Sequence, residues 1–347
     1  MSVSLGAGVA TPSRVVVDDR QPPDRHTPQM TTPTLSSIPR DDQHTDYDTF
    51  AGVYPALPTP FDADGNVDHD RLATRAARLA DTVDGLVPVG STGESATLTH
   101  DEHVAVVETV VGSVDCPVIA GSGSNATHEA VSLSERAVDA GADALLLISP
   151  YYNRPESRGV RTHYTRVADA VDVPCIVYNV PSRTGSNLDP ETVATLAEHP
   201  TIRGYKAASG DAAQISAVIE RTRREAFDVL SGDDTLTHPV VSLGGTGTIS
   251  VVGNVEPART RAMVERGLAG DVATARDHHH ELAPLTRALF RETNPIPVTE
   301  AMAIREDAAP RLRDPLTRAT PETRDRLQTV LSALDETAEP AQGVTGA

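Results

Sequence analysis

The sequence predicts an α/β protein, a (β/α)8 TIM barrel followed by a C-terminal helical region. From Phe50 onward, short runs rich in β-branched residues alternate with Ala-rich stretches of helical period. Eight such runs follow one another at roughly 30-residue intervals, the length of a βα unit. They are apolar throughout, as parallel strands buried on both faces are. A doubly wound open sheet is the alternative that fits the same alternation.

The predicted strands comprise residues 53–57, 85–89, 117–120, 144–148, 174–178, 202–206, 227–230 and 247–251. Helical patterns between them include residues 70–80, 101–111, 128–140, 163–170 and 190–198. Two of these begin with a recognisable cap. Thr99 is followed three residues later by Glu102, as in a capping box, and Asp189 precedes Pro190 at the first helical position.

Composition divides the chain into four parts. Residues 1–48 are rich in Pro, Thr, Ser and Asp without an apolar period, which predicts a disordered N-terminal extension. Residues 49–256 carry the barrel and the catalytic site. Residues 257–336 have helical patterns and no strand pattern, and residues 337–347 are predicted to be a flexible tail.

The balance of charge excludes several classes of function. The 30 basic and 49 acidic residues give a net charge of −19, which leaves no basic surplus for nucleic-acid phosphates. No apolar run approaches the ~20 residues of a membrane-spanning helix, and no signal pattern opens the sequence. Cys116 and Cys175 form neither a disulfide framework nor a metal motif. We therefore expect a cytoplasmic protein without a membrane segment.

One compositional bias is sharper than the rest. Of the 30 basic residues, 29 are arginine and only Lys206 is lysine. With abundant Asp and Glu and 3% aromatic residues, this bias indicates adaptation to high salt, although a GC-rich genome also favours arginine. Either pressure removes dispensable lysines. The one that remains is a candidate for chemistry that an always-protonated guanidinium cannot perform.

The active site of a TIM barrel forms at the carboxyl ends of its strands. Lys206 ends the sixth predicted strand among apolar neighbours, which would lower its pKa and supply a free amine for Schiff-base chemistry. A solvated surface lysine is the alternative, which this composition disfavours. Tyr178 ends the preceding strand and is a candidate for transferring protons to and from the adduct.

Two further loops at this end are polar. Residues 90–94, with the sequence GSTGE, can direct N–H groups and hydroxyls toward a carboxylate, although GSTG is also an ordinary turn. Tyr151 and Tyr152 follow the fourth strand and are candidates either for the site or for packing at the rim.

These motifs together resemble the dihydrodipicolinate synthase / N-acetylneuraminate lyase family of class I pyruvate-dependent lyases, over about residues 50–302. The similar segments are GSTGESATLTHDEH from Gly90, IAGSGSNATHEA from Ile119, SPYYNRP from Ser149, YNVPSRTG from Tyr178, YKAASG from Tyr205, LSGDDT from Leu230, GTISVVGN from Gly247 and ETNPIP from Glu292. Their order and spacing carry the resemblance, including 28 positions from Tyr178 to Lys206 and 26 from Tyr152 to Tyr178.

The resemblance implies a role for each matching residue. Lys206 would form the imine with pyruvate, and Tyr178 would pass the protons that form and dehydrate the carbinolamine. Ser91 and Tyr152 would complete a hydroxyl relay, Tyr152 reaching in from a neighbouring subunit. The active form would therefore be a homo-oligomer, commonly a dimer of dimers in this family. No cofactor other than the pyruvate imine, and no metal, is implied.

The substrates follow from the same resemblance. Thr92 and the N–H groups of its loop would hold the pyruvate carboxylate, and the backbone at Ile249 would close the pocket. Arg183 would bind the carboxylate of the incoming aldehyde, L-aspartate 4-semialdehyde, as a two-pronged donor. The product would be 4-hydroxy-tetrahydrodipicolinate, an intermediate of lysine (diaminopimelate) biosynthesis.

Related synthases also carry a feedback site for L-lysine at a subunit interface. The corresponding residues here are Ser95, Ala96, His100, His103, Asn125, Glu129 and Tyr151. The amide, the tyrosine hydroxyl and the carboxylate suit an amino acid, and the histidines suit its side-chain end. The alternative is that the two histidines only pack on one face of a helix.

Three departures leave the substrate open. The usual Thr-Thr pair is Ser91-Thr92, Ala207 stands where synthases carry Glu, and Tyr205 stands where a small aliphatic residue is common. An aldolase for a 2-keto-3-deoxy sugar acid or N-acetylneuraminate is therefore the alternative, which Arg183 disfavours.

Two alternatives come from other classes. A metal-dependent aldolase is suggested by three adjacent histidines, residues 278–280, but adjacent residues splay around a helix. A catalytically silent barrel acting as a sensor is disfavoured by the intact lysine, tyrosine and arginine.

Overall fold

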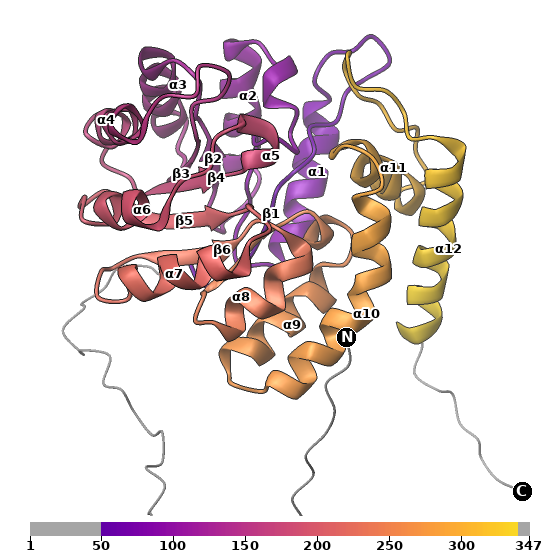
Figure 1. The fold of residues 1–347 in the computed structure, drawn as a ribbon. Coiled ribbons are helices and arrows are strands. Elements are labelled where there is room, and N and C mark those ends of the chain that lie inside the picture. The colour runs from indigo at the N-terminus through magenta and orange to yellow at the C-terminus, as the bar shows by residue number, and fades with distance from the viewer. Residues whose placement is uncertain (1–49, 339–347) are drawn as a thin grey trace, which may run out of the picture. The chain divides into compact units, whose positions relative to one another are not determined.

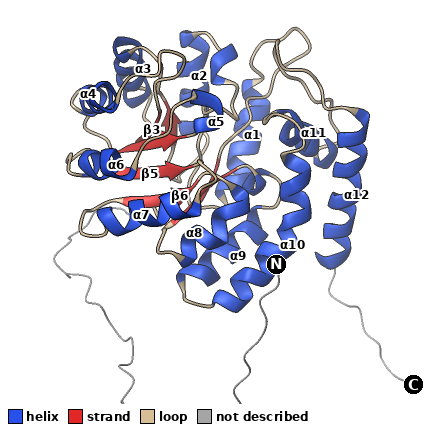
Figure 2. Ribbon diagram, viewed as in Figure 1, coloured by secondary structure: helices blue, strands red, loops and turns tan. Residues whose placement is uncertain are grey.

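A computed structural model describes residues 50–338 of the chain. Its parallel sheet has the strand order β1-β7-β6-β5-β4-β3-β2, and helices surround the strands (Figure 2). The strands are β1 (Gly52–Pro55), β2 (Ile119–Gly121), β3 (Ala144–Ile148), β4 (Cys175–Asn179), β5 (Ile202–Ala207), β6 (Asp228–Ser231) and β7 (Gly247–Ser250). The helices are α1 (His69–Ala80), α2 (His100–Val111), α3 (Thr127–Asp139), α4 (Ser157–Ala168), α5 (Pro181–Thr184), α6 (Pro190–Ala197), α7 (Ala212–Thr222), α8 (Thr237–Ser242), α9 (Pro257–Leu268), α10 (Val272–Leu289), α11 (Ile296–Arg305) and α12 (Pro321–Ala338).

The second predicted strand, residues 85–89, is reduced to two single parallel bridges, from Val87 to Ala56 and from Leu86 to Val118. The N–H of Val87 donates to the Pro55 carbonyl at 2.9 Å, and the N–H of Leu86 donates to the Pro117 carbonyl at 2.9 Å. The segment thus joins β1 to β2 and closes the barrel, which excludes the open sheet. A regular strand was the wrong prediction here. Pro88 has no N–H to donate, and Val89 leaves the extended conformation with φ 49°.

Alternate residues of each strand face opposite sides, and this decides which side chains enter the barrel. On β4, Ile176 and Tyr178 pack in the interior cluster, whereas Val177 packs against the surrounding helices. On β5, Tyr205 and Ala207 belong to the outer cluster. The residue between them, Lys206, therefore faces the interior.

The helices begin close to their predicted positions. The capping box at Thr99 is formed by reciprocal hydrogen bonds with Glu102, and the Asp189 side chain accepts from the N–H of Thr192 at 2.8 Å. Helix α4 begins at Ser157, six residues before the prediction at 163. Its first turn is polar and exposed, so apolar periodicity could not reveal it.

The predicted C-terminal region contains helices α9 to α12 and no strand, and α10, α11 and α12 lie beside one another (Figure 1). Helix α9 packs on β1 and α8, within the layer around the barrel. Helix α12 continues to Ala338, two residues into the predicted tail 337–347. The predicted extension 1–48 and residues 339–347 of that tail lie outside the described residues. Within residues 50–338, no helix is long and apolar enough to cross a membrane.

Candidate active site

Lys206 lies near the carboxyl end of β5, with 6% of its surface exposed. In the sheet register it stands beside Tyr178 on β4 and Leu230 on β6. Its Nζ is 4.2 Å from the centroid of the Tyr178 ring. The structure therefore brings together the two residues that the sequence predicted to form the reactive pair.

Burial sets the protonation of both groups. Desolvation lowers the pKa of Lys206 to about 7, against the opposing charge of Asp234 and assisted by Arg183. Burial also raises the pKa of the Tyr178 hydroxyl, which Arg183 and a hydrogen bond with Ser91 partly offset. At neutral pH the site thus holds free amine beside a protonated phenol.

The two departures on β5 do not alter the pocket wall. Tyr205 and Ala207 pack outward among the helices, and the Tyr205 hydroxyl accepts from Nδ2 of Asn179 at 2.8 Å. The prediction that its neighbours in sequence bury Lys206 is therefore wrong for Tyr205 and Ala207, because the residues on either side of it on the strand face away. The barrel interior provides the burial instead.

The loop of residues 90–94 is a tight turn at the same end of the barrel. The N–H of Gly93 donates to the Gly90 carbonyl at 3.0 Å, and the Thr59 hydroxyl donates to the Gly93 carbonyl at 2.7 Å. A Cβ at Gly121 would lie 2.5 Å from the Val89 carbonyl oxygen, so only glycine lets the loop approach β2. Thr92, in this loop, is buried with 4% exposure.

Asn294 connects two predicted substrate-binding residues but was not itself predicted as a site residue. Its side-chain Nδ2 donates to the Thr92 hydroxyl at 2.9 Å, and its backbone carbonyl accepts from Nη2 of Arg183 at 2.6 Å. It lies between α10 and α11, 202 positions after Thr92. The segment ETNPIP was the available signal, but it lies so far along the chain from Thr92 and Arg183 that the sequence did not predict this contact.

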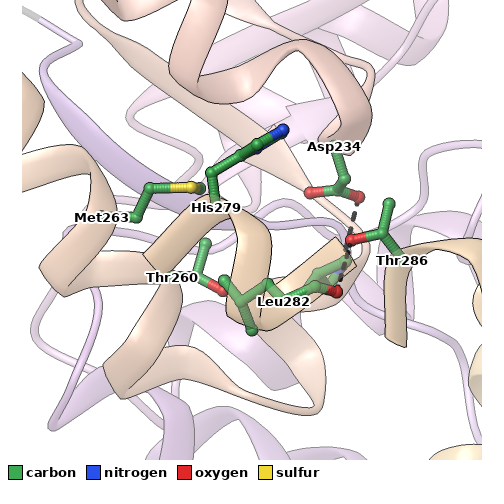
Figure 3. A pocket seen from close by; sticks show the side chains of 7 residues that line it. Asp234, Thr260, Met263, His279, Leu282 and Thr286 are labelled. Atoms are coloured by element: carbon green, nitrogen blue, oxygen red, sulfur yellow. Dashed lines mark hydrogen bonds between the residues drawn. The ribbon is translucent and has the colours of Figure 1, made fainter. Parts of the chain in front are cut away.

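Asp234 is the second residue without a predicted role, although it lies in the segment LSGDDT. It is buried with 7% exposure and accepts from the Ser250 hydroxyl at 2.5 Å and from the N–H of Val251 at 2.9 Å. Its charge acts on Lys206. It also lines a pocket of about 10 Å³, the space of one water, with Met263, His279 and Thr286 among other residues (Figure 3).

The remaining predicted residues differ in their burial. Arg183 is exposed on α5, and Ile249 is buried on β7 in the interior cluster. Tyr152 is 87% exposed with a left-handed φ of 67°. No hydrogen bond joins it to Tyr178 or Ser91 within the described part of one chain, so a single chain leaves the predicted relay incomplete.

Some of the predicted effector residues also come together. Nε2 of His100 is 3.1 Å from Oε1 of Glu129, and the other carboxylate oxygen, Oε2, accepts from the Ser124 hydroxyl. His103 is buried, and burial lowers its pKa to about 4. Its neutral ring therefore donates through Nε2 to the Gly121 carbonyl at 2.7 Å. His103 thus packs against the Gly121 backbone, whereas the half-exposed His100 remains accessible.

The histidines at 278–280 lie on α10, and the ring centroid of His279 is 5.8 Å from that of His238 on α8. Among residues 50–338, no group of His, Cys, Asp or Glu side chains is arranged to hold a metal ion.

Known proteins give an independent comparison. The family model described as the dihydrodipicolinate synthetase family matches residues 49–334. Proteins named 4-hydroxy-tetrahydrodipicolinate synthase from Haloarcula marismortui and Natronomonas pharaonis are 62% and 60% identical to this chain. Those matches cover 82% and 83% of this chain and 94% and 99% of the relatives. A solved structure, DHDPS from Cyanidioschyzon merolae with lysine bound, has a TM-score of 0.79 at 37% identity, over 82% of this chain and 98% of that one.

Gly232 provides the space for the Lys206 side chain. A Cβ at this position would lie 2.8 Å from both Cγ and Cε of Lys206. We predict that Gly232→Ala displaces the amine and slows covalent trapping of pyruvate by borohydride on the order of 100-fold. Overpacking should lower the free energy of unfolding by about 1–3 kcal/mol. Gly159→Ala, on the exposed face of α4, is the matched control. Equal trapping rates in the two variants would show that the lysine tolerates the methyl group.

Proposed function

Because the chain belongs to the dihydrodipicolinate synthetase family, we propose that it condenses pyruvate with L-aspartate 4-semialdehyde to 4-hydroxy-tetrahydrodipicolinate, as a class I lyase of lysine biosynthesis. The observation that carries the assignment of the reactive group is the environment of Lys206. It is the sole lysine, buried near a strand end beside a phenol, with its pKa lowered to about 7. The electron sink is the imine itself, so the reaction uses no separate cofactor.

The first step is imine formation. The neutral amine of Lys206 attacks the carbonyl carbon of pyruvate, and the resulting carbinolamine loses water to give the imine. Tyr178, whose ring lies 4.2 Å from Nζ, passes the protons, and Ser91 extends the relay through its hydrogen bond to Tyr178. The exposed hydroxyl of Tyr152 from a neighbouring subunit would complete it. Catalysis then requires at least a dimer.

The pyruvate carboxylate lies in the loop of residues 90–94. Since the Thr92 hydroxyl already accepts from Asn294, its own proton is free to be donated to the carboxylate. The N–H groups of Ser91 and Thr92 would add further donors, since those of Gly93 and Glu94 donate within the turn. The backbone at Ile249 closes the pocket from β7. Asn294 is a positioning residue in this scheme, because it acts through Thr92.

The second step joins the two substrates. Loss of a methyl proton converts the imine to an enamine, which attacks the aldehyde carbon. Arg183 binds the carboxylate of this aldehyde through the guanidinium N–H groups that do not contact Asn294. An aldolase for a sugar acid remains the second candidate, because Ser91 matches that branch of the family. Such a substrate offers Arg183 no matching second carboxylate near the aldehyde.

We also propose that L-lysine binds at Ser95, Ala96, His100, His103, Asn125, Glu129 and Tyr151. A relative from Cyanidioschyzon merolae was solved with lysine bound, and the His100–Glu129 pair is in place here. Glu129 would take the α-amine, and Tyr151, next to Tyr152, would couple the ligand to the relay. His103 contributes by supporting the Gly121 backbone.

Pyruvate with borohydride should add one covalent label per chain, at Lys206. Because the chain contains no other lysine, the intact mass nearly locates the label. Lys206→Arg should abolish labelling, since a guanidinium stays protonated. Labelled Lys206→Arg protein would contradict the assignment.

Arg183→Ala should raise the KM for aspartate semialdehyde by about 10- to 150-fold, from the loss of roughly 1.5–3 kcal/mol of charge-assisted binding. The KM for pyruvate should change far less. Arg183→Lys, which keeps the charge but loses the planar fork, should give an intermediate value. Equal effects on both substrates would assign Arg183 a scaffold role through Asn294, and faster turnover of sugar acids would favour the alternative substrate.

L-lysine in the millimolar range should slow initial rates measured in molar salt, with a coupling of about 1–3 kcal/mol between the two sites. Glu129→Gln should weaken this inhibition, whereas Glu108→Gln, exposed on α2, should leave it unchanged. An unchanged rate in the unsubstituted enzyme, with no heat of lysine binding by calorimetry, would refute the effector site.

A further inference from the structure

A polar cavity of about 140 Å³ lies between α11 and α12, away from the barrel interior. The two helices pack beside each other in the C-terminal region (Figure 1). The residues that line the cavity are Glu300, Ala303, Ile304, Asp307, Ala308, Arg324 and Gln328. None of them belongs to the active site or to the predicted lysine site.

Glu300 is a buried carboxylate in this cavity that lacks close hydrogen-bond donors within residues 50–338. Its side chain is 2% exposed, and its Oε2 is buried without a hydrogen-bond partner among the described residues. Oε1 lies 3.5 Å from Nη2 of Arg318 and 3.4 Å from Nε of Arg324, both on side chains about half exposed. A buried carboxylate held only by such distant pairs needs a further donor.

The α12 side of the cavity carries groups complementary to the Glu300 carboxylate. Arg324 and Gln328 are one helical turn apart on α12 and therefore share a face. Asp307, with a left-handed φ of 48°, follows α11 and adds a second carboxylate. Ala303, Ile304 and Ala308 supply the apolar part of the lining. Cationic and anionic groups thus face the same small space.

We propose that this cavity binds a small zwitterionic amino acid. Its ammonium group would donate to the carboxylates of Glu300 and Asp307, and its carboxylate would accept from Arg324 and Gln328. The guanidinium disfavours a bare metal cation, and the two carboxylates disfavour a dicarboxylic ligand. The volume of about 140 Å³, partly open to solvent at the exposed Asp307, Arg324 and Gln328, favours a small ligand. Glycine and L-alanine are of that size.

This site goes beyond the proposed function, and its test measures binding instead of catalysis. Titration calorimetry of the full chain with glycine, and separately with L-alanine, should give saturable binding. Glu300→Gln keeps the side-chain shape but removes the charge, and it should weaken binding about 10- to 100-fold. Ala308→Leu, at a partly exposed position, should block the cavity sterically and gives a second variant if Glu300→Gln folds poorly.

Two controls distinguish this cavity from other sites. Arg326→Gln removes a charge from the opposite side of α12, about 200° around the helix from Arg324, and should leave binding unchanged. Glu129→Gln, in the predicted lysine site, should also leave it unchanged. The proposal is overturned if neither amino acid binds at tens of millimolar, if Glu300→Gln and Ala308→Leu bind as well as the unsubstituted chain, or if only Glu129→Gln loses binding.

Discussion

The burial of one amine inside the barrel is the constraint on which the rest of the site depends. The pleat of β5 turns Lys206 inward between Tyr178 and the space left by Gly232. Desolvation then favours the neutral amine, and Asp234 opposes it. Asp234 remains compatible with a neutral lysine because the Ser250 hydroxyl and the N–H groups of Val251 and Val252 already satisfy its carboxylate. A carboxylate without these donors would favour the ammonium form of Lys206 more strongly.

The C-terminal region completes the active end of the barrel. Asn294 connects Thr92 with Arg183, and Arg313 joins the region to two barrel loops. The Arg313 guanidinium binds the Glu102 carboxylate with two N–H groups, donates to the Gly65 carbonyl at 2.8 Å, and lies over the Phe61 ring. Its backbone N–H donates to the Glu94 carboxylate, at the end of the loop of residues 90–94. The loops that would hold the substrates are therefore fixed from outside the barrel.

Features that neighbouring residues determine were predictable from the sequence, whereas contacts between separate segments were not. Lys206 and Tyr178 were predictable because adjacent strand ends and a biased composition are local signals. Because side chains alternate between the two faces of a strand, Tyr205 and Ala207 must point outward once Lys206 is known to point inward. Asn294 and Asp234 act through tertiary contacts that leave no local pattern in the sequence. The strand at Pro88 is irregular because proline has no N–H to donate, which the apolar pattern of residues 85–89 does not show. The proposed role of Tyr152 would require a second chain.

The composition and the chemistry have one common explanation. Arginine can replace lysine wherever a positive charge is needed, and it forms two-pronged contacts such as Arg75 with Glu306, at 2.8 and 2.7 Å. In molar salt the Debye length is about 3 Å, so exposed pairs such as Arg136–Asp101 are screened, whereas Arg75 and Glu306, with 7% and 15% exposed side chains, are screened much less. Arginine thus forms the buried ion pairs that hold the fold at high salt, as Arg75 does with Glu306. Selection for arginine stops at Lys206, because nucleophilic attack needs an amine that can lose its proton near neutral pH, and a guanidinium cannot.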